Sequence, residues 1–107
     1  MDWEVYVRYG NKNYKLDAEI IHQSNQIMRI KVHGNSRHII LENDYPFLQL
    51  KGSNKAINWK LRDAGILDVR EEKNAALIAH IISNLDYQIK GTGQKHLDRI
   101  NQLKGKQ

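Results

Sequence analysis

The chain has 107 residues, 40% of them hydrophobic, which suits one domain with a single core. Its 17 basic and 12 acidic side chains give a formal net charge of +5, which favours acidic partners. The absence of cysteine excludes disulfides, thiolate metal sites and cysteine nucleophiles. The sequence has no stretch long and apolar enough to span a bilayer and no signal-peptide pattern at its start, so we expect a soluble, cytoplasmic protein without a transmembrane segment.

The first part of the chain predicts four β-strands. Hydrophobic and polar residues alternate with a period of two, which is typical of half-buried strands. Turn-forming residues separate the alternating stretches, so consecutive strands pair as antiparallel hairpins. The expected strands cover residues 3–9, 14–22 and 27–33, and a fourth strand places Ile39 and Leu41 inward.

A two-residue loop at Asn35 and Ser36 fixes the register of the third and fourth strands. With that loop, the apolar residues fall on one face, where Val32 faces Ile39. Oppositely charged residues directly across two strands stabilise a sheet by about 0.2 to 1 kcal/mol, and this register produces such a pair without using it as a criterion. The predicted outer pairs are Arg29 with Glu42 and His33 with His38.

The registers of the first two hairpins follow from the same rule. A turn at Ser24 with Ile20 opposite Met28 keeps the apolar residues of the second hairpin together. The first hairpin is less regular, because its predicted register brings like charges together. The predicted outer pairs are Glu19 with Arg29, Asp17 with Lys31, Glu4 with Glu19, and Arg8 with Lys15.

Residues 45–62 predict a further hairpin. Leu48 and Leu50 indicate a short fifth strand, residues 52–55 form a turn, and a sixth strand follows. In this hairpin Leu50 pairs with Ile57 and Leu48 pairs with Trp59. Its outer side then shows Phe47 beside Lys60 and Tyr45 near Arg62.

Residues 68–91 predict one amphipathic helix. Asp68 is the expected N-cap, and Glu71 completes a capping box with it. Lys90 and Gly91 suit the last turn and the residue that follows a helix. The apolar stripe consists of Ala75, Ile78, Ile81, Ile82, Leu85 and Ile89.

These elements predict a two-layer α+β fold, an antiparallel β-meander of five to six strands with one C-terminal amphipathic helix packed on one face. We expect residues 1–90 to form the single domain and residues 91–107 to form a basic, loosely ordered C-terminal tail. The layout of strands followed by one closing helix is similar to that of single-stranded nucleic-acid-binding modules of the Pur type, and more loosely to pleckstrin-homology-like domains. This resemblance implies a fold, and a function only by analogy.

The excess positive charge is concentrated in the second half of the chain. Residues 1–50 contain six basic and six acidic side chains, whereas residues 51–62 contain four basic side chains and no acid. In single-stranded nucleic-acid binding, phosphates contact cations and bases stack on aromatic rings, at about 1 to 3 kcal/mol per base. The candidate site for nucleic acid or another polyanion is Lys51, Lys55, Lys60, Arg62, Tyr45 and Phe47.

Two other interpretations of the surface remain open. Cations on an edge hairpin also prevent aggregation between sheet edges, without any ligand. The alternative function is that of a protein–protein interaction or homodimerisation domain, which would use an edge strand or outward apolar residues. Those apolar residues are Tyr6, Ile21, Ile27, Ile40 and Phe47.

No set of residues predicts catalysis, a cofactor or a metal site. His33 and His38 are a predicted cross-strand pair, but zinc sites need three or four ligands and no third is evident nearby. No serine has a histidine and an acid in the pattern that a catalytic triad requires. We therefore expect a non-enzymatic protein.

Overall fold

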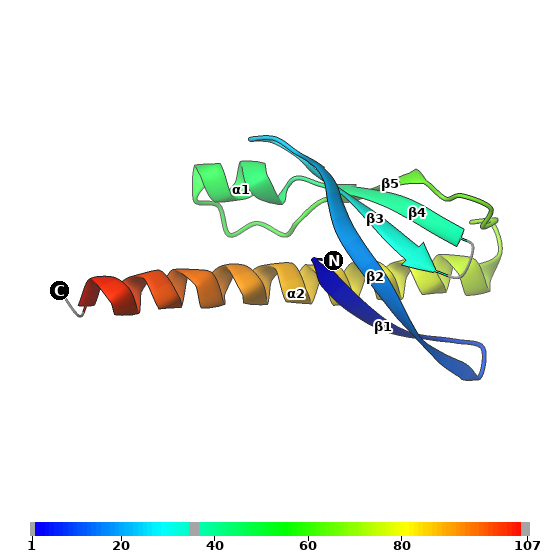
Figure 1. Ribbon diagram of the computed structural model, residues 1–107. Helices are drawn as coiled ribbons and strands as arrows, with labels where there is room; N and C mark the ends of the chain where they lie inside the picture. Colours follow the sequence, from blue (N-terminus) through cyan, green and yellow to red (C-terminus); the bar gives the residue numbers. More distant parts are fainter. Residues whose placement is uncertain (1, 35–36, 106–107) are drawn as a thin grey trace.

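In the computed structural model, the chain forms a five-stranded antiparallel sheet with one long helix across one face (Figure 1). The structure describes the backbone of residues 2–34 and 37–105, and the side chains of residues 2–34 and 37–91. The strands lie in the order β1-β2-β3-β4-β5, so the predicted α+β meander with a C-terminal helix is confirmed. The elements are β1 (Trp3–Tyr9), β2 (Lys12–Gln23), β3 (Met28–Gly34), β4 (Arg37–Asn43), α1 (Tyr45–Lys51), β5 (Trp59–Asp63) and α2 (Glu72–Gly105).

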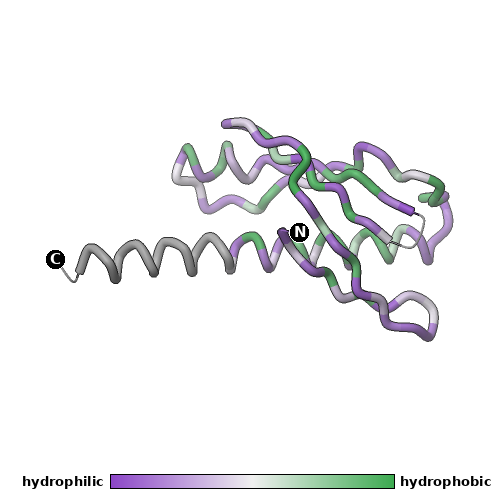
Figure 2. The backbone as a smooth tube through the Cα atoms, in the orientation of Figure 1, coloured by the Kyte–Doolittle hydropathy of each residue, from purple (hydrophilic) through white to green (hydrophobic). Residues whose placement is uncertain are grey.

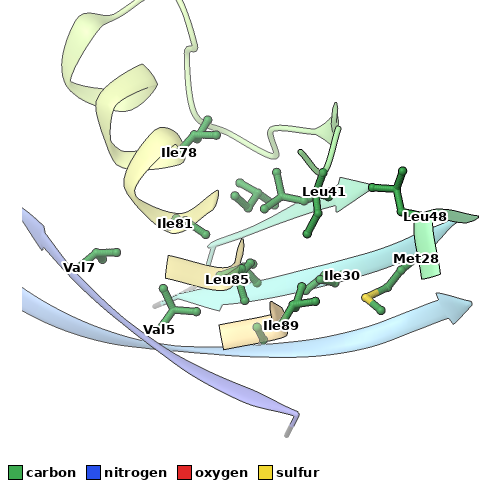
Figure 3. Close-up of a cluster of buried hydrophobic side chains, with 14 residues drawn as sticks. Val5, Val7, Met28, Ile30, Leu41, Leu48, Ile78, Ile81, Leu85 and Ile89 are labelled. Carbon is green, nitrogen blue, oxygen red and sulfur yellow. The ribbon is translucent and has the colours of Figure 1, made fainter. Parts of the chain in front are cut away.

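The hydrophobic core lies between the inner face of the sheet and α2. Hydrophobic and hydrophilic residues alternate along the strands and along the coloured part of α2 (Figure 2). The side chains of Val5, Ile30, Leu85 and Ile89 gather between the two layers (Figure 3). Burying this apolar surface is the main favourable term that holds the helix on the sheet.

The predicted apolar stripe of the helix is confirmed except at its first position. Ile78, Ile81, Leu85 and Ile89 are buried, whereas Ala75 is exposed. Asn74 occupies the buried position one turn before Ile78, and its Oδ1 accepts a 2.9 Å hydrogen bond from the Tyr9 hydroxyl. A buried amide at this end is stable because it has this partner.

Both predicted helix ends are wrong. The helix begins at Glu72, because Asp68 accepts hydrogen bonds from the backbone N–H and the guanidinium of Arg70 in a separate turn. At the other end, α2 continues through Gly91 to Gly105, since a glycine inside a helix costs only about 1 kcal/mol relative to alanine. The side chains of the expected basic tail from residue 92 onward lie outside the described part, so its loose order stays a prediction.

The predicted register of β3 and β4 is confirmed at each predicted pair. Val32 pairs with Ile39 inside and Arg29 with Glu42 outside. The Arg29 Nε donates a 2.9 Å hydrogen bond to Glu42 Oε1, so the expected ion pair exists. The loop residues 35–36 lie outside the described residues.

The predicted registers of the other two hairpins are wrong by two residues, and by three beyond an irregularity in β2. Glu4 pairs with Asp17, because Gly10 adopts a positive φ of 65° and closes a turn so tight that β2 begins at Lys12. In the second hairpin Glu19 pairs with Lys31, and an irregularity between Ile20 and His22 inserts one extra residue into β2. An alternation rule alone does not locate such a bulge.

Residues 45–51 form a helix, so the predicted hairpin over residues 45–62 is wrong. Pro46 lies in the first turn of α1, and Asn43 Oδ1 accepts a hydrogen bond from the Tyr45 N–H. Gly52 ends the helix in the left-handed conformation, with φ 62° and ψ 30°. The expected sixth strand is β5, and it pairs with β4 instead.

Candidate functional site

The six residues predicted to bind a polyanion do not share one hairpin. The aromatic candidates lie on a helix and the last two cations on a strand, so the predicted surface of interleaved rings and charges is not formed. Tyr45, Phe47 and Lys51 belong to α1, Lys55 to the loop after it, and Lys60 and Arg62 to β5.

The two aromatic candidates have other contacts. The Tyr45 side chain packs against the hydrophobic core, so its ring is not free to stack on a base. Phe47 is 40% exposed, and the Lys51 Nζ lies 5.7 Å from the centroid of its ring, within the range of a cation–π contact. Both rings lie on α1, outside the sheet face that carries Lys60 and Arg62.

A different group of cations gathers on the outer face of β3, β4 and β5. Glu42 of β4 pairs with Arg29 of β3 on one side and Lys60 of β5 on the other. The Arg62 Nε lies 3.8 Å from Glu42 Oε1, and Lys31 follows Arg29 by two residues on the same face. We call Arg29, Lys31, Lys60 and Arg62 the cation cluster.

Glu42 is the anion around which the cation cluster is organised. Its side chain is almost covered, with 9% of the residue exposed. The hydrogen bond from Arg29 lowers the pKa of Glu42, burial opposes this, and the charges of Arg62 and Lys60 lower it further. The ionised carboxylate orients both arginines, and the four cations with one acid leave a local charge of +3.

Two acids border the cation cluster. Glu19 pairs with Lys31 across the strands, but its Oε1 lies 2.8 Å from His33 Nε2. Asp63, opposite Ile40, accepts a 2.8 Å hydrogen bond from the Gly65 N–H. Within the part of the chain whose side chains are described, neither Lys31 nor Lys60 has a carboxylate oxygen within 4.0 Å. These two lysines are therefore available to an external anion.

Sequence reasoning missed half of the cation cluster. The predicted register pairs Glu19 with Arg29 and Asp17 with Lys31 and so implies that both cations are neutralised, whereas Glu19 pairs with Lys31 and Asp17 with His33. Lys60 and Arg62 were identified, but they were placed against α1 residues rather than against β4. A proline near the start and a glycine at the end of residues 45–52 were the signals that predict α1.

The outward apolar residues do not form one patch. Tyr6 lies on β1 and Ile40 on β4, three strands apart, which corresponds to about 14 Å at the usual strand spacing. Phe47 lies on α1. A surface assembled from these residues for a second copy is therefore not continuous across the sheet.

The β1 edge of the sheet is partly covered by α2. Asn84 Nδ2 donates a 3.2 Å hydrogen bond to the Tyr6 carbonyl, and Gln88 Nε2 donates a 2.8 Å hydrogen bond to the Glu4 carbonyl. These carbonyls are backbone groups that an added strand would need. The helix thus reduces the capacity of β1 to pair with another chain.

No protein-family model matches the sequence. Neither a curated protein nor a solved structure matches it either. Among residues 2–34 and 37–91, no three acidic or histidine side chains are grouped so that they could hold a metal ion. The described helices include none with the length and hydropathy to cross a bilayer. The candidate site therefore rests on the geometry of the outer face.

Glu42→Gln is expected to reduce the dependence of stability on acid pH. Because the folded protein depresses the pKa of Glu42, its ionised form stabilises the fold above the unfolded pKa, and this contribution is lost as pH falls through the folded pKa. Urea unfolding at about pH 6 and about pH 3 measures the difference. The wild type should lose more stability between these values than the variant.

The matched control is Glu72→Gln. Glu72 is exposed in the first turn of α2, and no ion pair of its side chain is seen within the described part. Its variant should follow the wild-type pH dependence. If both substitutions reduced the pH dependence of stability equally, Glu42 would have no special role.

Proposed function

We propose that this protein is a non-enzymatic module that binds the phosphate backbone of single-stranded nucleic acid through the cation cluster. The observation that supports the proposal is an excess of positive charge on three adjacent strands, four cations against Glu42 and the bordering Asp63, organised by the nearly buried Glu42. Arg29 and Arg62 are held by that carboxylate, which limits the entropy they lose when they contact a phosphate. Lys31 and Lys60 supply mobile charge on either side.

The size of the cation cluster sets the expected number of phosphate contacts. Two residues along a strand span about 7 Å and three adjacent strands span about 10 Å. Consecutive phosphates of an extended single strand are about 6 to 7 Å apart, so a path across the cluster matches at most about three phosphates. Contacts of this number give modest affinity.

Base recognition is not part of the proposal. Tyr45 packs against the core and Phe47 belongs to α1, so neither ring adjoins the cations on the sheet. Without a stacking platform, affinity comes from phosphate contacts and is independent of sequence. Binding should therefore be similar for different base compositions.

The proposal predicts a defined salt dependence. Three phosphate contacts on a single strand give a slope of log K against log salt concentration of about −2, and Lys31→Gln with Lys60→Gln should bring it to about −0.7. Fluorescence anisotropy with a labelled oligodeoxythymidine of about twelve nucleotides measures both slopes. The double variant should also weaken binding at low salt.

A second double variant, Lys12→Gln with Lys73→Gln, removes the same net charge elsewhere. Lys12 begins β2 and Lys73 lies in the first turn of α2, and both are exposed. An equal loss of affinity in both double variants would show that net charge alone causes binding. If the protein bound a heparin fragment but no oligonucleotide at low salt, the ligand of the cation cluster would be a polyanion other than nucleic acid.

A further inference from the structure

The inner face of the sheet and the first turns of α2 line an apolar cavity of about 360 Å³ that is open to solvent on one side. It lies at the end of the core where β3 finishes and β4 begins, beside the first part of α2. This site is on the opposite face of the sheet from the cation cluster, so the inference does not depend on the proposed function. Apolar side chains that line the cavity include Leu16, Val32, Ile39, Leu67, Leu77 and Ile81.

Gly34 leaves part of this space open. It pairs with Arg37 across β3 and β4, and it lies in the row of the inner face that includes Leu16. A Cβ at residue 34 would lie 3.6 Å from Leu16 Cδ2 and 3.8 Å from the Arg37 carbonyl oxygen. A side chain at residue 34 would therefore extend into the cavity.

Arg37 places a positive charge at the rim of the cavity. Alternation along β4 puts it on the same face as Ile39, which is buried in the core. Within the described residues, no carboxylate oxygen lies within 4.0 Å of its guanidinium. Arg37 is exposed, so its guanidinium is available to the carboxylate of a ligand whose apolar body enters the cavity.

The hydroxyl groups at the rim differ in their availability. The Tyr9 hydroxyl donates to Asn74 Oδ1 at 2.9 Å, and the Asn74 Nδ2 in turn donates to the Asp68 carbonyl at 3.0 Å. This chain of hydrogen bonds fixes one wall of the cavity. Tyr14 also lines the cavity, and its exposed side chain has room to contact a ligand.

We propose that the cavity binds a small carboxylic acid with an apolar body, whose carboxylate pairs with Arg37. A cavity of about 150 Å³ holds benzene, so about 360 Å³ accommodates about two fused rings or a chain of about ten carbons. The apolar lining binds the body, and the guanidinium takes the carboxylate through two parallel hydrogen bonds. A pocket of this size is within the usual range for small-molecule sites.

The test uses 2-naphthoate and its uncharged analogue 2-naphthylmethanol, each titrated calorimetrically into the full chain. We expect 2-naphthoate to bind with a Kd of about 1 mM or below. Arg37→Gln should weaken 2-naphthoate about tenfold and leave 2-naphthylmethanol unchanged, because only the acid uses the charge. Arg62→Gln removes a cation on the opposite face and should change neither titration.

Two further measurements locate the ligand. Leu77→Trp places a large ring in the cavity, so it should abolish binding of both compounds while circular dichroism confirms the fold. If that variant does not fold, amide chemical shifts of the wild type decide the location. Shifts on adding 2-naphthoate should be largest at Val32, Ile39 and Ile81 and small at Met28, at the other end of the core.

Three results would overturn the proposal. They are no binding of 2-naphthoate at several times the expected Kd, equal weakening by Arg37→Gln and Arg62→Gln, and largest shifts outside the cavity. The oligonucleotide experiments are separate from these, because Arg62 belongs to the cation cluster and Arg37 does not. Failure of one site therefore leaves the other proposal standing.

Discussion

Gly65→Ala is expected to destabilise the protein by about 3 kcal/mol or more. Gly65 has a φ of 62°, which costs a residue with a side chain about 1 to 2 kcal/mol. A Cβ at this position would also lie 2.4 Å from the His38 carbonyl oxygen, a distance that requires the backbone to move. Urea unfolding of the wild type and the variant measures the loss of stability.

Gly10→Ala is the matched control. Gly10 has a φ of 65°, but nothing lies within 4 Å of a Cβ built there. Its substitution should cost only the conformational term of about 1 to 2 kcal/mol. A loss in Gly65→Ala that is no larger than that of Gly10→Ala would contradict the close approach of the two backbones.

The contact at Gly65 links the fold to the candidate sites. It holds the connection between β5 and α2 against β4 at His38, next to Arg37 at the rim of the cavity. The hydrogen bond from the Gly65 N–H also engages the carboxylate of Asp63, at the border of the cation cluster. One residue without a side chain therefore contributes to the geometry of both faces.

The sequence predicted those parts of the fold that follow from regular alternation and helical spacing. The pairing of Val32 with Ile39 needed only a short loop and an apolar face, and both are local properties. Four of the six apolar stripe residues of the helix are buried, and Ile82 is half-buried, for a similar reason. These features depend on hydrophobic periods of two and 3.6 residues, which can be read from the sequence without knowing the fold.

The parts that the sequence did not predict depend on interruptions of those periods. The extra residue between Ile20 and His22 shifts the β3 partners of His22 and Gln23 by one further residue. In residues 45–51, the alternation of Leu48 and Leu50 predicts a strand, whereas these residues lie on α1, with Leu48 buried and Leu50 exposed.

The two candidate sites escape prediction for different reasons. The cation cluster joins β3, β4 and β5, so it depends on knowing that β5 pairs with β4. The cavity depends on Gly34 and on where α2 crosses the sheet, which no local pattern contains. The fold class can therefore be predicted from local patterns, whereas the position of a site also requires knowledge of which distant segments pair.

Leu85→Ala is expected to cost about 3 kcal/mol, since burial of leucine in a core and the cavity left by its removal give losses of about 2 to 5 kcal/mol. Leu85 is 0% exposed and lies between the sheet and the helix beside Val5 and Ile89 (Figure 3). A small domain has a stability of about 5 to 15 kcal/mol, so this loss is a large fraction of the total. Urea denaturation with a constant m-value measures it.

The control for Leu85→Ala lies half a turn further along the same helix. Tyr87 is 81% exposed, so Tyr87→Ala removes more atoms than Leu85→Ala but almost no buried area. Its effect should stay within about 0.5 kcal/mol, as for other exposed substitutions. If the two variants lost equal stability, α2 would be bound to the sheet through another face, and the cavity walls formed by Leu77 and Ile81 would be lost with it. A large difference between them supports the packing on which both candidate sites depend.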